Sequence, residues 1–587
     1  MEKTLVIVES PSKATKIQEY LGKEYIVLAC KGHIVDLGKG SHHGIGVEIN
    51  NNFKPHYVLM DDKVSTLSSI MHAAKECKTI LLAPDPDREG ESIAWHLFER
   101  LKDFEKPIKR IEFNEITKDK IKKAIKNPRD IDLNLFKAQE ARRILDRIVG
   151  FMASPFLINF WGNNLSAGRV QSVVTRMIVD REKEIEKFIP EEYWTIQVSL
   201  QKDNNIFTTK FVDKIISQKD ADNKKTELLS EKEYIVKDVI AEQELKKPSP
   251  PLITSTLQKI MSKEYGFAPD RTMKAAQSLY ENGYCSYIRT DSVRANDDAI
   301  KEVRDWIKNN SYELPNKINI FKNKDAAQDA HECIRPTDIN LLPDNNFAMI
   351  DPDEKKVYEI IWKYFIASQM SPAVYNTLKV ILNPKNSKLE VKASGKALKS
   401  EGFLKLLKAS DQSKIDIPNL LKGDIVNLSG TNPVKSEKKL TQSPPRYSID
   451  KLISELENKN IGRPATYADL ISKISNRNYV EMKGNVFHPT TNGQKINDIL
   501  IKYFSFLNYD YTANMESNLD KIAEGKEDQL KMLSEFFTVF SKELKEAYIN
   551  NNGILCNKCQ SPMVKKNKKD GTSFLACSSY PYCRNTK

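Results

Sequence analysis

The chain has 587 residues and a formal net charge of +12, with 40% of its residues hydrophobic and 29% charged. This length predicts about four domains, and no uninterrupted apolar run approaches the roughly 20 residues of a membrane helix. The first residues, MEKTLVIVES, have too short an apolar run and too early an acid for a secretory signal. We therefore expect a cytoplasmic protein without membrane contact, and the basic balance leaves nucleic acid open as a partner.

Apolar patterns divide the sequence into α/β, helical and β-like stretches. Short runs such as TLVIVES and TILLAP alternate with amphipathic stretches over residues 1–125, which predicts an α/β unit with a largely parallel sheet. Farther along, two β-like stretches flank a helical one, so one domain is predicted to be interrupted by another. The predicted ranges are 126–190 and 446–549 for a helical domain, 191–255 and 374–445 for a β-rich domain, and 256–373 for a helical insert.

Acidic residues gather just after two of the predicted strands. ILLAPDPDREGE places Asp85, Asp87 and Glu89 behind one apolar run. LVIVESPSKA places Glu9 and Lys13 behind the first run. If the two strands are neighbours, the four acids share a pocket where they would bind magnesium and keep one carboxyl protonated as a general acid, while the lysine neutralises a phosphate. A solvated acidic turn and a helix-capping glutamate are the alternatives.

Two helical stretches carry polar faces opposite apolar ones. In ARRILDRIVGF, Arg143, Asp146 and Arg147 lie on one side of the predicted helix. In LSAGRVQSVVTRMIV, an apolar stripe leaves three residues free to face solvent or DNA, namely Arg169, Ser172 and Arg176. Such arginines bind backbone phosphates without reading sequence, and a salt-bridged exposed face is the competing interpretation.

Two later motifs combine residues suited to phosphate chemistry. In GYCSYIRTDS, Tyr287 and Arg289 share a face if the segment is a strand, so a phenol and a guanidinium would meet one phosphate. Tyrosine attacks phosphorus and also leaves it readily, although a lone tyrosine is more often part of a core. In AHECIRPTD, His331 and Arg335 share a face if the segment is helical, which suits a phosphate grip or a capped surface helix.

The C-terminal tail carries a metal-ligand pattern. Its cysteines form C-x2-C, a gap of 17 residues and C-x5-C, at Cys556, Cys559, Cys577 and Cys583. This spacing predicts a tetrahedral structural zinc site, because so small a lobe with few apolar residues needs a metal to fold. Residues 551–587 also hold seven Lys or Arg and one acid, so the tail is basic.

Together these stretches resemble the type IA DNA topoisomerases, and among them the bacterial topoisomerase I group. VIVESPSKA and DPDREGESIAWHL are similar to the acidic motifs of the Toprim domain, and YIRTDS to the nucleophile motif. AHECIRPT, SAGRVQS, ARRILDRIVGF and IGRPATYADLISKI are similar to further family motifs, and FLACSSYPYC to a zinc ribbon. The resemblance runs from residue 1 to about 550 in the family's order. It implies a toroid of four domains with an N-terminal Toprim domain at 1–125, and a C4 zinc ribbon at 553–587.

The resemblance also implies a reaction and its residues. Tyr287 would attack one DNA strand, join the 5′ phosphate and release a 3′ hydroxyl, without ATP, so that negatively supercoiled DNA is relaxed by strand passage and religation. Asp85, Asp87 and Glu89, with Glu9, would hold magnesium, and Glu9 would also be the general acid on cleavage and the general base on religation.

By the same resemblance, Lys13 and Arg289 would stabilise the transition state and His331 would orient groups around the acids. Ten residues would line the single-strand groove: Arg143, Asp146, Arg147, Ser166, Arg169, Gln171, Ser172, Arg335, Arg463 and Thr466. The expected partner is single-stranded DNA within a negatively supercoiled duplex, bound by a monomer. The family's usual RNA polymerase attachment lies in a C-terminal region that is short here, so we expect no such contact.

Three other functions are considered. A topoisomerase III-like decatenase would carry YPRTDS and AHHAI-like motifs in place of YIRTDS and AHECI. A Toprim nuclease or primase would use the acids without Tyr287, and a purely binding protein would need no metal. Reverse gyrase is excluded because the chain lacks a helicase half and any GxxxxGK[ST] loop.

Overall fold

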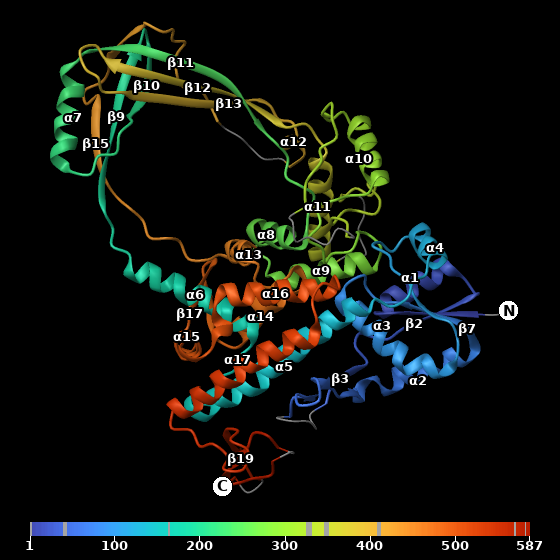
Figure 1. Cartoon of the computed structure of the whole chain (residues 1–587). Coiled ribbons are helices and arrows are strands. Elements are labelled where there is room, and N and C mark those ends of the chain that lie inside the picture. Colours follow the sequence, from blue (N-terminus) through green and yellow to red (C-terminus); the bar gives the residue numbers. More distant parts are fainter. Residues whose placement is uncertain are drawn as a thin grey trace.

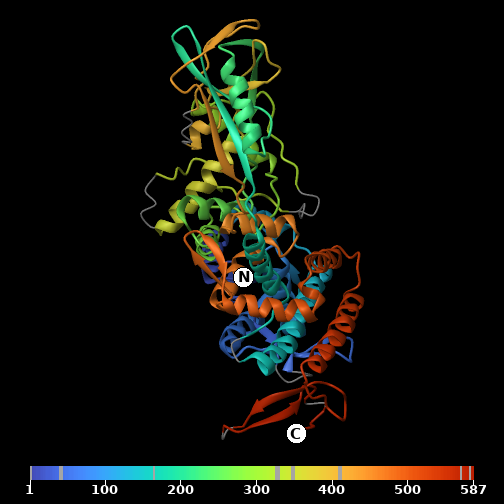
Figure 2. The same ribbon diagram turned by 90° about the vertical axis from the view of Figure 1, so that its left-hand side faces the viewer.

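The structure is a computed structural model that describes residues 3–38, 44–162, 165–323, 331–344, 351–407, 413–568, 571–580 and 583–587. The elements are arranged as a ring, with a β-sheet arch opposite a base of helices and the N-terminal α/β unit beside that base (Figure 1). Turned by 90°, the molecule is narrow and elongated, and the C-terminal hairpin lies at the end opposite the arch (Figure 2). The predicted mixed α/β fold class is confirmed.

The N-terminal unit is built on a four-stranded parallel sheet in the order β2-β1-β7-β8. Its strands are β1 (Lys3–Val8), β2 (Tyr25–Ala29), β7 (Cys77–Ala83) and β8 (Ile108–Arg110). Its helices are α1 (Pro11–Leu21), α2 (Val64–Glu76), α3 (Arg88–Leu101) and α4 (Lys118–Lys126). Small hairpins pair β3 (Val35–Leu37) with β6 (Tyr57–Leu59), and β4 (Val47–Glu48) with β5 (Lys54–Pro55).

The central strands place both acidic segments at one edge of the sheet. β1 and β7 are neighbours, with Val8 opposite Ala83, so Glu9 and the turn after Pro84 emerge side by side. Alternation along these strands separates two cores. Leu5 and Ile7 pack with α2 and α3, whereas Val6 and Val8 belong to a core shared with the helical insert of residues 254–368.

The arch is a seven-stranded antiparallel sheet made from two separated chain segments. The first supplies β9 (Glu192–Lys202), β10 (Asn205–Phe211) and β11 (Glu233–Lys246), with α7 (Gln218–Ser230). The second supplies β12 (Ala373–Pro384), β13 (Val391–Ser400), β14 (Ile425–Leu428) and β15 (Val434–Leu440), with α12 (Leu404–Leu407). The order is β10-β13-β12-β11-β14-β9-β15, and a further β10–β9 pairing closes the sheet on itself.

Between these segments lies the helical insert, which completes the ring. It contains α8 (Thr254–Tyr265), α9 (Pro269–Glu281), α10 (Asp297–Asn309) and α11 (Pro352–Ser368). α9 and the loop after it lie against the N-terminal α/β unit (Figure 1).

The base joins two more segments that are distant in sequence. It contains α5 (Leu133–Trp161), α6 (Arg169–Lys187), α13 (Ile449–Asn458), α14 (Tyr467–Asn476), α15 (Thr491–Tyr503), α16 (Tyr509–Ala523) and α17 (Gln529–Asn550), and the hairpin β16 (Val480–Lys483) with β17 (Val486–Pro489). α5 is long and apolar enough to cross a membrane by length and composition. Its buried residues, such as Leu145 and Phe156, pack in one core with α16 and α17, so packing accounts for that composition.

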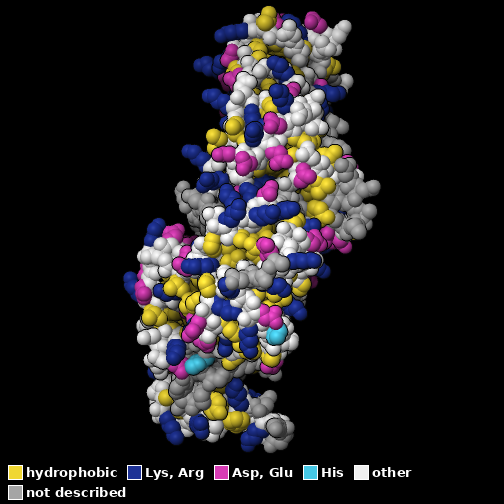
Figure 3. Space-filling model, turned by 90° about the vertical axis from the view of Figure 1, so that its right-hand side faces the viewer, with side chains coloured by type: hydrophobic (Ala, Val, Ile, Leu, Met, Phe, Trp, Pro, Cys, Tyr) yellow, Lys and Arg dark blue, Asp and Glu magenta, His cyan; other side chains and the backbone are white. Residues whose placement is uncertain are grey.

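Charged side chains are mixed on the surface. On the face shown in Figure 3, Lys and Arg alternate with Asp and Glu from the arch to the C-terminal end. The basic excess is therefore not gathered on this face.

Candidate active site

The turn between β7 and α3 carries two of the predicted acids. β7 ends at Ala83, so strand alternation does not extend to Asp85 and Asp87. Asp87 is the N-cap of α3, and its Oδ1 accepts a hydrogen bond from the Gly90 amide at 2.8 Å. A Cβ on Gly90 would lie 2.0 Å from the Asp85 carbonyl oxygen, so only glycine permits this close turn.

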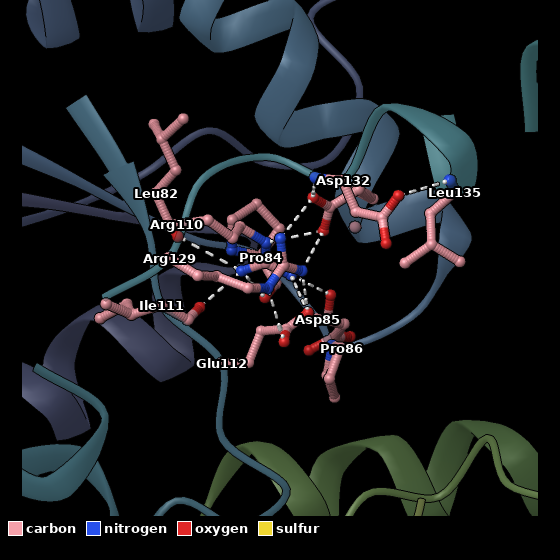
Figure 4. Close-up of polar contacts among 12 residues, drawn as sticks. Leu82, Pro84, Asp85, Pro86, Arg110, Ile111, Glu112, Arg129, Asp132 and Leu135 are labelled. Carbon is pink, nitrogen blue, oxygen red and sulfur yellow. Dashed lines mark hydrogen bonds and ion pairs between the residues drawn. The ribbon is translucent and has the colours of Figure 1, made fainter. Parts of the chain in front are cut away.

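A buried arginine holds the backbone of this turn (Figure 4). Arg110, fully buried at the end of β8, donates from Nη1 to the Pro84 carbonyl at 2.9 Å and from Nη2 to the Asp85 carbonyl at 2.6 Å. Its Nε donates to Glu91 at 3.1 Å, and Glu91 also accepts from Arg129 at 2.8 Å. The acidic turn is therefore fixed by a buried ion network rather than by strand pairing.

Lys13 and Glu9 lie beside this turn. Lys13 Nζ is 2.5 Å from Asp85 Oδ1, and both side chains are buried. Burial opposes the charge of Lys13, but the nearby Asp85 and Glu9 raise its pKa overall. Burial, together with the charges of Asp85 and Asp87, raises the pKa of Glu9 to about 8 against the opposing effect of Lys13. Glu9 is therefore protonated at neutral pH in the free protein.

The tyrosine of the helical insert reaches the same acids. The Tyr287 hydroxyl donates to Asp87 Oδ2 at 2.6 Å, and Arg289 Nη1 lies 3.5 Å from that oxygen. Burial, followed by the charges of Asp87 and Asp85, raises the pKa of the phenol well above its usual value. His331 Nε2 donates to the Pro86 carbonyl at 2.9 Å, and its ring lies 6.3 Å from the Tyr287 ring. Tyr287 is only 3% exposed, so its side chain is enclosed between the insert and the N-terminal α/β unit in this closed form.

The backbone around these residues differs from the sequence prediction. Residues 286–292 form bends rather than a strand, and the Tyr287 amide donates to the Asn114 carbonyl at 2.7 Å. Residues 331–336 are not helical, so the predicted shared helix face of His331 and Arg335 is wrong. Arg335 is buried, and its Nη2 donates to Glu115 at 2.7 Å.

Glu89 points to a different partner. It lies 2.7 Å from His33 Nε2, and although burial opposes ionisation, that hydrogen bond and the charge of His33 lower its pKa to about 2. Among the described residues, the acids do not converge on one point: only the four tail cysteines bring three or more potential ligand atoms within 4.8 Å of one another. Asp85, Asp87 and Glu89 are engaged by Lys13, Tyr287 and His33 respectively.

A cleft of about 1660 Å³ opens beside these residues. It connects Glu9, Asp87 and Arg289 with Arg463 and Thr466 across the base. The cleft therefore runs from the acids and the insert at one end to the short helix η4 (Pro464–Thr466) at the other.

The residues predicted to line the groove differ in their contacts and burial. Arg143 and Arg147 of α5 both bind Asp36 Oδ1, at 2.5 and 2.9 Å. The Ser166 amide donates to the Tyr479 hydroxyl at 2.8 Å, and Gln171 is half-buried on the first turn of α6. These side chains remain near the base surface.

The predicted solvent-facing stripe of α6 is wrong for two residues. Arg169 is 0% exposed, with Nη1 2.5 Å from Glu516 Oε1 and Nε 3.1 Å from Asp146 Oδ1. Ser172 is buried, and its hydroxyl accepts from the Gly168 amide at 3.2 Å. These two ion pairs join α6 to α5 and α16, although the buried Nη2 of Arg169 has no hydrogen-bond partner in the described structure.

The tail forms a separate metal-type cluster on the hairpin of β18 (Met563–Asn567) and β19 (Ser573–Cys577). Cys556 Sγ lies 3.6 Å from Cys583 Sγ, and Cys559 Sγ lies 3.3 Å from Cys577 Sγ. Tetrahedral ligands about 2.3 Å from zinc would stand ~3.8 Å apart, so the four thiols suit that ion. Although burial raises the pKa of Cys556, hydrogen bonds from the Lys558 and Cys559 amides lower it to about 6, which favours a thiolate.

Comparison with known proteins connects these features. The family model for DNA topoisomerase matches residues 130–534, that for the Toprim domain matches residues 4–116, and that for the topoisomerase DNA-binding C4 zinc finger matches residues 553–587. The chain belongs to the type IA DNA topoisomerases. Full-length topoisomerase I from Thermotoga maritima has 33% sequence identity and a TM-score of 0.82, over 99% of this chain and 97% of that one. The predicted family is confirmed, and DNA is the partner that membership implies.

Sequence reasoning missed the residues that support the topoisomerase site. Arg110, Glu91 and Arg129 fix the acidic turn, and His33 engages Glu89. One signal was available in the sequence. In IKRIEF, Arg110 lies between apolar residues, and it is the last residue of a strand of the Toprim sheet. A charged residue in such a place either reaches solvent or has a buried partner.

We expect Arg110→Met to loosen the acidic turn of the topoisomerase. Removing a buried ion-pair partner costs about 3–5 kcal/mol, and two carbonyls of the turn lose their donors. Hydrogen exchange of the β7 and α3 amides should become faster, and DNA cleavage slower. Arg100→Met, on the exposed side of α3, is the matched control. Unchanged exchange in the Arg110 variant would show that strand pairing alone holds the turn.

The zinc ribbon should depend on its metal for folding. Among the described residues of the tail, its own buried core consists of Cys556, Met563 and Cys577, which is too small to fold alone. We expect Cys559→Ser, or removal of zinc with a chelator, to abolish amide protection in β18 and β19 while the Tyr287 region stays protected. Zinc content and hydrogen exchange measure this. Cys77→Ser, outside the tail, is the control, and a protected hairpin without metal would contradict the expectation.

Proposed function

We propose that this protein relaxes negatively supercoiled DNA by cutting one strand through a 5′-phosphotyrosine ester, passing the other strand and resealing the break. The observation that carries this proposal is the hydrogen bond from the Tyr287 hydroxyl to Asp87, within an acidic turn that also faces Lys13 and Arg289. A nucleophile from one chain segment and acids from another meet only where the insert docks on the Toprim unit, which suits a site that must open and close.

In the cleavage step, Tyr287 Oη forms a bond to the phosphorus and the bond from phosphorus to O3′ breaks. The phenol proton passes to Asp87, the acceptor that the hydroxyl already faces. The O3′ oxygen takes the proton of Glu9, whose raised pKa keeps the carboxyl protonated. Religation runs the same steps backwards, and the ester conserves the bond energy, so no ATP is needed.

Cations of the chain support this reaction. Lys13 forms an ion pair with Asp85, and Arg289 lies beside Tyr287. Both cations are therefore near the place where negative charge develops on the phosphate. His331 holds the Pro86 carbonyl and thereby orients the turn. These groups stabilise the transition state without forming a bond to the substrate.

Magnesium fits the donor set of this turn. Asp85, Asp87 and Glu89, together with Glu9, supply the oxygen ligands that this hard cation prefers. Burial, followed by the charges of Asp85 and Asp87, raises the pKa of Glu9, and a bound cation would offset the repulsion among these carboxylates. Bound there, magnesium would neutralise phosphate charge and align the ends for religation. In the closed form each acid other than Glu9 has a partner in the chain, so we propose that the ligands regroup when DNA enters.

The ring-shaped arrangement suits strand passage if one part of the ring moves away from the rest. We propose that residues 256–373 move as one body carrying Tyr287, hinged on the β-rich parts 191–255 and 374–445. The fixed body would comprise the Toprim domain 1–125 and the helical parts 126–190 and 446–549. We further propose a monomer that acts in the cytoplasm on single-stranded segments of supercoiled DNA. Arg143, Arg147, Arg463 and Thr466 would contact that strand.

The test is relaxation of negatively supercoiled plasmid with magnesium and without ATP. Stepwise relaxation is expected, and denaturant added during the reaction should trap the protein on the 5′ phosphate end created at the break. A 5′-labelled strand should then run free while a 3′-labelled strand carries the protein. Relaxation that needs ATP, or protein trapped on the other end, would contradict the proposal.

A further inference from the structure

An aspartate of α16 bridges two arginines across the cleft. Asp520 Oδ1 lies 2.7 Å from Arg88 Nη2, and its Oδ2 lies 2.5 Å from Arg463 Nη2. Arg88 directly follows Asp87 at the start of α3, whereas Arg463 belongs to the loop before η4. All three residues line the cleft that also holds Glu9 and Arg289. The bridge therefore lies where a strand approaching the acids must pass.

The arginine pair has more donor capacity than the aspartate uses. Each carboxylate oxygen takes one guanidinium, an arrangement that two non-bridging phosphate oxygens reproduce. Arg88 Nε is buried and has no hydrogen-bond partner in the described structure. A phosphodiester carries ester oxygens besides its two charged ones, so it could satisfy this remaining donor as well.

The bridging aspartate differs from the neighbouring acid of the same helix. Glu516 is 1% exposed and pairs with Arg169 in the core, where no strand can displace it. Asp520 is 24% exposed, and its two partners are 19% and 22% exposed. Because all three side chains are partly exposed on the cleft, a phosphate can reach the two guanidinium groups and replace the carboxylate between them.

We propose that Arg88 and Arg463 form a binding site for one backbone phosphate of the single strand, and that Asp520 occupies this site until DNA displaces it. The inference rests on the proposed function, because it takes the cleft as the path of the cleaved strand. Asp520 then competes with DNA, and the closed cleft binds more weakly than its arginines alone would. Release of the aspartate also frees α3, which begins at the acidic turn, from α16.

The experiment measures binding of a fluorescent single-stranded oligonucleotide by anisotropy, with every variant made in the Tyr287→Phe background, which cannot cut the strand, so that only binding is followed. Asp520→Asn should lower the dissociation constant about fivefold, the effect of removing one partly exposed competing charge. Asp510→Asn removes the same charge from an exposed position of the same helix and should change binding much less. In an Arg88→Gln background, the gain from Asp520→Asn should disappear.

The outcomes separate this inference from the proposed function. If Asp520→Asn binds no tighter than Asp510→Asn, or gains equally without Arg88, the inference is overturned. Asp520→Glu, which keeps the charge, guards against a folding defect: if it and Asp520→Asn both weaken binding, the aspartate supports the cleft instead of competing for it, and the inference fails. A parent protein that binds single strands and forms the 5′ adduct upholds the proposed function in either case. A parent that does neither contradicts that function.

Discussion

Replacement of Tyr287 by phenylalanine is expected to abolish both plasmid relaxation and the 5′ protein adduct, because the ring keeps its place but loses the oxygen that attacks phosphorus. The ring packs against Tyr280 and faces His331, with centroids 5.2 and 6.3 Å away, and these contacts do not involve the hydroxyl. Asp87 keeps its contact with Arg289. The variant loses only the hydrogen bond from the hydroxyl to Asp87, so the fold and single-strand binding should stay within about twofold of the parent.

The control for this variant is Tyr312→Phe. Tyr312 belongs to the same insert but stacks on Trp306, away from the acids, so its loss should leave relaxation intact. Relaxation and a denaturant-trapped adduct are measured side by side for the parent and both variants. If Tyr287→Phe still cuts DNA in the presence of magnesium, the acids act as a nuclease site and the tyrosine is part of the core.

Local patterns in the sequence were sufficient for features that depend on neighbours in the chain. The apolar runs ending at Val8 and Ala83 predicted parallel strands, and the structure places those strands side by side with Glu9 and Asp85 at their ends. The cysteine spacing predicted a tail cluster, and the four thiols do converge. Both features follow from short-range periodicity or from a ligand set within 28 residues.

Local patterns could not predict features that depend on partners far away in the sequence. The apolar stripe of α6 was identified, but Arg169 was assigned to solvent, because its partner Glu516 lies far along the chain. A charged residue next to an apolar stripe gives the same periodicity whether it meets water or a buried acid. The bend at Tyr287 was likewise missed, since its backbone partner is Asn114 in another domain rather than an adjacent strand.

The closed form also links packing to catalysis. Val6 and Val8 of the Toprim sheet share a core with Tyr280 and Tyr287 of the insert, so the gate is held by apolar contact as well as by hydrogen bonds. In the proposed strand passage, opening the ring at this contact would expose that apolar surface, at a cost that bound DNA must offset. The proposed nucleophile, Tyr287, would thereby be kept from water and from DNA until a strand has entered the cleft.

Replacing Glu9 by glutamine is expected to slow the cleavage step by about 10²–10⁴-fold, the usual contribution of a general acid. The amide fills the same space but supplies no proton to the departing O3′ oxygen. Glu19→Gln makes the same substitution on the exposed face of α1 and serves as the control. Single-turnover cleavage of a labelled oligonucleotide with metal chelated isolates this step from religation.

The pH dependence of the same reaction separates proton donation from a purely structural role of Glu9. Burial and the neighbouring carboxylates raise its pKa to about 8, so the carboxyl is protonated below that pH and loses its proton above it. The parent's cleavage rate should be level below pH 8 and should fall about tenfold per pH unit well above it, because only the protonated form donates. Glu9→Gln has no such group, so its slower rate should lack this fall. If the parent and the variant lose activity over the same pH range, another group supplies the proton and Glu9 acts only by holding the acidic turn in place.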